Sequence, residues 1–134
     1  MSGTPPRPAA DVVAAWLAAV NVGDADAALA LTAPDVMIVG PHGAARGRDV
    51  LREWMGEAGA TFDTRAVYAR GDDVVVAQRG VWRDAATGAV RGEADVATRF
   101  RVAEGEVAEL ERHDDLAAAL DAAGLTAADA LPGA

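Results

Sequence analysis

Apolar residues in the first part of the chain recur at helical spacing. The pattern predicts a helix that starts at Asp11 as N-cap and stops at Gly23. It predicts a second helix that is capped by Asp24 and ends before Pro34, and a third at 48–58. One face of the first predicted helix carries its apolar residues, Val12, Val13, Trp16, Leu17 and Val20.

Strand-like alternation dominates the rest of the chain. A short strand is predicted at 36–39 and long strands at 62–70, 74–83, 93–102 and 107–114, with Asp115 capping a last helix at 116–123. This order predicts an α+β domain with a cone-shaped, curved antiparallel sheet. About three to four helices are expected on its concave side, enclosing a pocket. The domain is expected to span 11–125, between flexible tails at 1–10 and 126–134.

Composition narrows the class of protein. The chain has 134 residues, 51% of them hydrophobic, which is enough for one core without a disulfide or metal staple. A net charge of −9 argues against nucleic-acid and membrane partners. There is no Cys and no Lys, so thiol and Schiff-base nucleophiles are excluded. No apolar run approaches about 20 residues. We expect a cytoplasmic protein without cofactor or metal.

The run from Trp16 to Asp24 resembles the SnoaL-like and ketosteroid isomerase-like proteins of the nuclear transport factor two-like superfamily. The similarity continues through 33–36, 47–51, 100–102 and 115–125. The resemblance implies a sheet wrapped around a cavity that is closed by helices. It also implies a homodimer formed through the outer sheet face, and a small apolar molecule as ligand.

Ketosteroid isomerases combine a carboxylate base with an oxyanion hole made of a Tyr and a protonated Asp. The resemblance places the Tyr position at Trp16, the base at Gly40 and the protonated Asp at Thr98. An indole N–H and a hydroxyl can still donate hydrogen bonds, but Gly40 can abstract no proton. We therefore expect no steroid isomerisation by that mechanism.

Period-two alternation predicts which strand residues face the cavity. With the large apolar residues of the helices, it gives an expected pocket lined by Trp16, Trp54, Met55, Gln78, Trp82, Thr98, Phe100 and Leu110. The resemblance adds Gly40, at the position of the base. The opposite parity predicts a charged outer face on which Arg79, Arg99 and Arg101 meet Glu109 and Glu111 across strands.

Three polar residues are the best candidates for catalysis. Arg112 and Asp114 have inward parity near the pocket mouth, where they could clamp an anionic ligand or polarise a water. Limonene-epoxide hydrolase-like members use an Asp-Arg-Asp set in this way; the plainer alternative is a surface pair at a strand end. His42 follows Gly40-Pro41 and is the best acid–base candidate, with a solvated loop His as the alternative. His113 has outward parity.

The sequence leaves three functions open. The first is a cofactor-free isomerase, cyclase or lyase that acts on an apolar ligand. The second is a ligand-binding or dimerising domain without catalysis. The third is water activation at Arg112 and Asp114, as in epoxide hydrolases.

Overall fold

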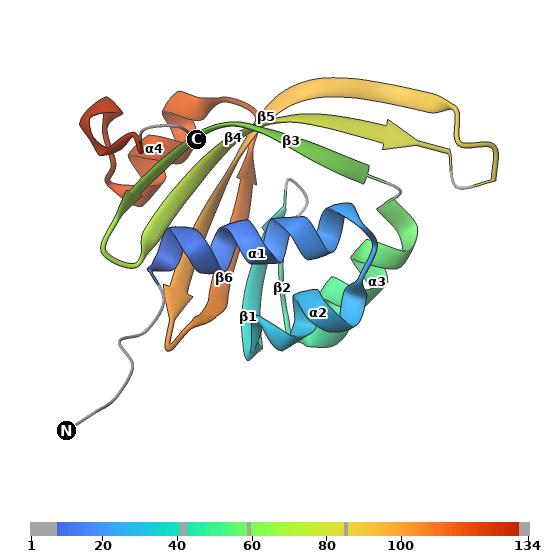
Figure 1. The fold of residues 1–134 in the computed structure, drawn as a ribbon, viewed down its shortest axis with the longest axis horizontal. Coiled ribbons are helices and arrows are strands. Elements are labelled where there is room, and N and C mark those ends of the chain that lie inside the picture. The colour runs from blue at the N-terminus through green and yellow to red at the C-terminus, as the bar shows by residue number, and fades with distance from the viewer. Residues whose placement is uncertain (1–7, 41–42, 59, 85, 132–134) are drawn as a thin grey trace.

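The computed structural model describes residues 8–40, 43–58, 60–84 and 86–131. It is an α+β domain in which helices pack on a curved, open, six-stranded mixed sheet (Figure 1). The strands lie in the order β2-β1-β6-β5-β4-β3. Their bounds are β1 Thr32–Gly40, β2 Gly43–Arg46, β3 Ala60–Arg70, β4 Asp73–Arg83, β5 Val90–Ala103 and β6 Glu106–His113.

The helices α1 (Ala9–Asn21), α2 (Ala25–Ala30) and α3 (Arg48–Ala58) follow the predicted order. The expected N-cap at Asp11 is wrong: α1 starts at Ala9, two residues before Asp11, and Pro8 is the N-cap. Asp11 lies in the first turn instead, where a carboxylate interacts favourably with the helix dipole. Asp24 does cap α2: its side chain accepts a hydrogen bond of 3.1 Å from the Ala27 backbone N–H.

The sheet is mixed rather than purely antiparallel, because β1 runs parallel to β6. The other four strand pairs are antiparallel, including the β5–β6 hairpin that turns at Glu104 and Gly105. A parallel pair needs a long connection between its strands. About half of the chain lies between β1 and β6, so the connection is long enough.

The first strand is longer than the sequence predicts, and a second strand follows it. β1 contains Pro34, and its register to β6 shifts between Thr32 and Met37. A register shift accommodates a proline, which has no backbone N–H to donate. The exposed strand β2 shows no alternation. It forms by pairing with β1, from Met37↔Arg46 to Gly40↔Gly43.

The two faces of the sheet are covered by different helices. The main core lies between the first three helices and the concave face, and it includes the fully buried Val12, Val36 and Phe100. The fourth helix, α4 (Leu116–Ala123), lies on the opposite side (Figure 1). It packs over Val75 and Ala97. Three of the helices therefore enclose the concave side, and the fourth covers the part of the outer face around Val75 and Ala97.

The C-terminal segment, for which a flexible tail is expected from residue 126, lies against strand β3. Thr126 caps a single 3-10 turn, Ala127–Asp129, with a capping box. The Leu131 backbone N–H then donates to the carbonyl of Val67 at 2.8 Å. The segment thereby covers part of a sheet edge that would otherwise be open.

Candidate functional site

A cavity of about 280 Å³ lies between the helices and the concave face of the sheet. Strands β1, β3, β4, β5 and β6 and helices α1 and α3 contribute to its wall. Most of the lining is apolar: Trp16, Leu17, Ile38, Val39, Gly40, Leu51, Phe62, Phe100 and Leu110. The ring of Trp16 meets Phe100 edge-on, with 5.4 Å between the ring centroids. Such a wall binds by removing carbon from water.

Among the described residues, three polar side chains line the same cavity: Gln78 on β4, Thr98 on β5 and Arg112 on β6. We call these residues the Gln78 row. Thr98 lies directly opposite Arg112 in the β5–β6 register, and its hydroxyl donates to Gln78 Oε1 at 3.0 Å. Gln78 is only 2% exposed, and its Nε2 has no hydrogen-bond partner among the described residues. The row therefore presents unused hydrogen-bond donors to an apolar cavity.

Trp82 does not line the cavity, although the alternation of β4 predicts that it does. Its ring folds back over Gly80, so closely that a Cβ on Gly80 would lie 2.7 Å from the ring. The same ring lies beneath the guanidinium of Arg112, with 5.1 Å from Cζ to the ring centroid. It also meets Phe62 edge-on at 6.1 Å. Trp82 thus supports two residues of the cavity wall from outside the cavity.

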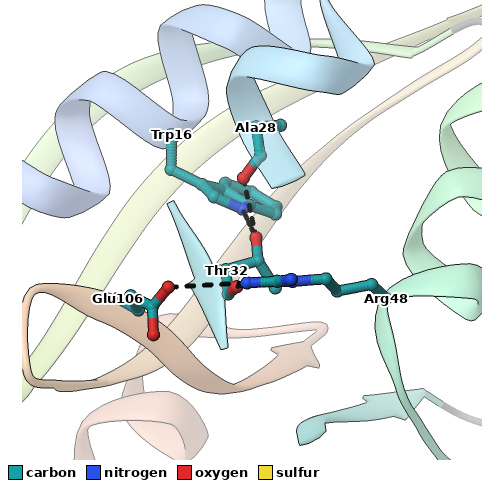
Figure 2. A network of polar contacts seen from close by, with 5 residues as sticks. All are labelled: Trp16, Ala28, Thr32, Arg48 and Glu106. Carbon is teal, nitrogen blue, oxygen red and sulfur yellow. Dashed lines mark hydrogen bonds and ion pairs between the residues drawn. The ribbon is translucent and has the colours of Figure 1, made fainter. Parts of the chain in front are cut away.

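A second polar cluster lies between α1, α2 and the first residue of β1 (Figure 2). We call Trp16, Ala28, Thr32, Arg48 and Glu106 the Thr32 network. The indole N–H of Trp16 donates to Thr32 Oγ1 at 3.0 Å, and this hydroxyl donates to the carbonyl of Ala28 at 2.7 Å. Arg48 donates two hydrogen bonds to the Thr32 carbonyl, at 2.9 and 2.7 Å, and its Nη2 lies 3.5 Å from Glu106.

This network changes one expectation about the cavity. The indole N–H of Trp16 was a candidate donor to a ligand, but it is used by Thr32. The hydroxyl hydrogen of Thr98 is likewise used, by Gln78. Both hydrogen bonds involve side chains that sequence spacing does not bring together. The unused donors belong instead to Gln78 and Arg112.

Arg112 and Asp114 are not brought together. Strand β6 ends at His113, so the alternation that predicts Asp114 on the inner face stops one residue before it. Asp114 is exposed and lines a separate groove beside α4, with Arg79, Asp95 and Leu116 among its neighbours. Water activation by an Arg112–Asp114 pair therefore has no geometric support.

Several predicted site residues lie outside the described part of the structure. They are the whole of His42 and the side chains of Trp54 and Met55. The cavity residues that sequence reasoning missed are Leu17, Ile38, Val39, Leu51 and Phe62. Leu17, Leu51 and Phe62 belong to apolar helix and strand patterns, which signalled burial but gave no sign of a cavity.

The charged outer face contains part of the predicted ladder. Arg99 pairs with Glu109 at 2.7 Å, as expected, whereas Arg79 pairs with Asp95 at 3.3 Å in place of Glu109 or Glu111. His113 Nε2 lies 2.7 Å from Glu111. The side chains of Arg99, His113 and Glu111 are only 17%, 20% and 26% exposed.

The described residues contain no cluster of three or more His, Asp or Glu side chains placed to hold a metal ion. Within the described ranges, no helix is both long enough and apolar enough to cross a membrane.

Comparison with known proteins assigns the family. The sequence model of the SnoaL-like domain matches residues 13–110, so the chain belongs to the SnoaL-like domain family. No curated protein sequence matches the chain.

Three solved structures show the same fold. An NTF2-like protein of unknown function from Cytophaga hutchinsonii superimposes with a TM-score of 0.72 at 18% identity, covering 85% of this chain and 95% of that one. TerC, co-crystallised with polyporic acid, gives 0.71 at 20% identity, with 87% and 98% coverage. A protein with a ketosteroid isomerase-like fold from Catenulispora acidiphila, in complex with trimethylamine, gives 0.67 at 22% identity, with 94% and 98% coverage.

Proposed function

We propose that this domain binds a small, mainly apolar molecule in the cavity between α1 and the sheet. The observation that carries the proposal is a hollow of about 280 Å³ with a carbon-rich wall and one polar row. This volume lies just below the range of about 300–1,000 Å³ that is usual for ligand sites. The small molecules crystallised with TerC and with the Catenulispora acidiphila protein support the same role for this fold.

Binding, rather than proton transfer, is the role that the described wall supports. Among the described lining residues there is no carboxylate or imidazole, and the polar groups are an amide, a hydroxyl and a guanidinium. Gly40 and Thr98 occupy the positions where the ketosteroid isomerase resemblance places the base and the protonated Asp. An isomerase, cyclase or lyase would need another acid–base group, for which His42 is the sequence candidate. A His42→Ala variant that still binds ligand but loses turnover would establish catalysis.

A neutral fluorescent probe tests the binding proposal. N-phenyl-1-naphthylamine brightens when it leaves water, and we expect saturable brightening at one site per chain. Gly40 lines the cavity, and a Cβ there would meet nothing closer than the Gly43 carbonyl oxygen at 3.9 Å. Gly40→Val should therefore fold and narrow the cavity, which weakens binding at least about fivefold.

Gly92→Val is the matched control. Gly92 lies on β5 outside the cavity wall, and a Cβ there meets nothing within 4 Å. This variant should bind the probe like the unmodified protein. If the probe does not bind, or if both variants bind it equally well, the cavity is not a ligand site.

We also propose that two copies pair through the outer face of β4, β5 and β6. The support is the family resemblance and the half-buried charged side chains of that face, including Arg99, whose Nε is buried without a partner among the described residues. Sedimentation at micromolar concentration should give about twice the 13.6 kDa of the chain. Association through charged pairs should weaken as salt is added. A monomer at every concentration would contradict this proposal.

A further inference from the structure

We propose that the ligand of the cavity is a small organic acid, whose carboxylate is bound by Arg112 and Gln78 and whose apolar, ring-sized body fills the rest. This inference rests on the proposed binding function and deepens it by naming the ligand class.

The charge of the cavity is positive and unbalanced. Arg112 is the only charged side chain among the described residues that line it. The chain as a whole has 21 acidic and 12 cationic side chains, yet Arg112 forms no ion pair with any described carboxylate. A partly buried cation without a counter-charge is unfavourable, and an anionic ligand would supply the missing charge.

The amide nitrogen of Gln78 has no hydrogen-bond partner among the described residues. Its Oε1 accepts the Thr98 hydroxyl hydrogen, which leaves Nε2 with two hydrogen atoms to donate and no acceptor among the described residues. At 2% exposure the group also has little access to bulk water. A buried donor in this state destabilises the empty protein, and a ligand oxygen would relieve it.

The unused donors lie on the two sides of Thr98. The Gln78 row crosses three neighbouring strands, with Thr98 in the middle and bonded to Gln78 on one side. Arg112 lies opposite Thr98 on the other side, and Trp82 lies beneath its guanidinium. A carboxylate has two oxygens and only accepts hydrogen bonds, so one group can bind donors on both sides of Thr98.

The apolar wall contains aromatic rings among its aliphatic side chains. The edges of Trp16, Phe62 and Phe100 and the small volume favour a compact ring system over a long chain. An amine ligand would face Arg112 as a like charge and would leave the donor of Gln78 unpaired. An acid satisfies both groups.

Matched naphthalenes test this inference by calorimetry. 2-Naphthoate and 2-naphthamide have the same ring and nearly the same shape, and they differ by one negative charge. Desolvation disfavours the naphthoate unless the protein binds its charge. We expect naphthoate to bind at least tenfold more tightly, which corresponds to about 1.4 kcal/mol. Added salt should reduce the preference.

Three variants locate the source of the preference. Arg112→Gln should abolish the preference for naphthoate while changing naphthamide affinity less than about twofold, and Arg112→Lys should restore part of it by restoring the charge. Arg91→Gln removes the same charge from an exposed position outside the cavity, so it should retain the full preference. Gln78→Met should weaken naphthoate binding about fivefold through the loss of its donor. Circular dichroism verifies that each variant is folded.

The outcomes separate this inference from the function on which it rests. Equal binding of the two naphthalenes, or a preference that survives in Arg112→Gln, overturns the organic-acid inference and leaves the cavity as a site for neutral molecules. Binding of N-phenyl-1-naphthylamine without binding of naphthoate overturns it as well. Failure of the neutral probe to bind removes the proposed function itself, and this inference with it.

Discussion

The Thr32 network and the Gln78 row are both buried polar clusters beside the main core, and they differ in whether their hydrogen bonds are complete. In the Thr32 network the donors bond within the cluster: the indole of Trp16 to Thr32, the Thr32 hydroxyl to Ala28, and Arg48 to the Thr32 carbonyl (Figure 2). In the Gln78 row only one hydrogen bond is made, and an amide nitrogen is left without a described partner.

The difference separates a stabilising cluster from a binding one. A buried network with all its groups satisfied holds helix, strand and loop in one arrangement, and removing a member leaves its partners unsatisfied. A row with unused donors contributes less to the empty protein, because its groups have already lost water without gaining full replacement. We therefore expect substitutions to lower stability in the first cluster and ligand affinity in the second.

The largest effect is expected for Thr32→Val. Thr32 is fully buried, and the valine would leave the Trp16 indole N–H without its acceptor. It would also remove one of the two hydrogen bonds to the Ala28 carbonyl, which still accepts from the Leu31 backbone N–H. The orphaned indole N–H costs about 1–3 kcal/mol and the lost hydrogen bond to Ala28 about 1 kcal/mol more, so we expect urea unfolding to show a loss of about 3 kcal/mol. Thr61→Val, an exposed control on β3, should change stability by less than about 0.5 kcal/mol. Equal effects at both sites would contradict a stabilising role for the network.

Gly80→Ala should have the next largest effect, because the new Cβ would overlap the ring of Trp82 at 2.7 Å. Overpacking of this kind costs about 1–3 kcal/mol, and it should displace the ring from beneath Arg112. Tryptophan fluorescence and thermal unfolding would report the two effects. Gly92→Ala has open space and should change neither signal. An unchanged spectrum in Gly80→Ala would show that the Trp82 ring does not lie against Gly80.

Arg48→Gln should cost about 1 kcal/mol. The variant loses the paired hydrogen bonds to the Thr32 carbonyl. The Arg48–Glu106 ion pair adds little, since its side chains are 40% and 33% exposed and solvent screens the attraction. Arg52→Gln, which removes a far more exposed pair with Asp26, should cost less than about 0.5 kcal/mol in the same assay. A larger loss for Arg52→Gln would contradict this order.

The smallest effect on stability is expected for the double variant Gln78→Met/Thr98→Val. It removes both partners of one hydrogen bond together with the unused donor, and such paired replacement is close to neutral. We expect a change within about 0.5 kcal/mol in chemical unfolding, accompanied by weaker naphthoate binding. A loss above about 2 kcal/mol would mean that the row stabilises the empty fold and is not reserved for a ligand.

Much of the fold could be predicted from local patterns. Asp115 caps α4 through a 2.7 Å bond to the Ala118 N–H, as the sequence predicts, and Gly124 ends the helix in the left-handed conformation. Glu104 and Gly105 both have positive φ in the hairpin turn that joins β5 and β6. These features depend on a few consecutive residues, whose backbone preferences are local. Strand alternation is local too, and it is the reason that Gln78, Thr98 and Arg112 could be assigned to one face.

Other features were decided by contacts between distant segments. The parallel pairing of β1 with β6, the formation of β2 and the position of α4 on the outer face depend on which surfaces meet, and no short pattern encodes that choice. Trp82 shows the same limit: alternation places it on the inner face, but its ring folds over Gly80 and leaves the cavity wall.

The sequence by itself determined most of the helices and strands, the N-caps of α2 and α4, and the side of the sheet on which each strand residue lies. These follow from a few consecutive residues or from backbone geometry repeated every two or 3.6 residues. Only the tertiary structure decided which buried polar groups are satisfied. Thr32 comes within reach of Trp16 and Arg48 through packing of α1 and α3 around β1, whereas no described acceptor reaches Gln78 Nε2. A change of a few tenths of an ångström in the donor–acceptor distance decides whether a hydrogen bond forms. Where donor and acceptor are far apart in the chain, that distance is set by packing.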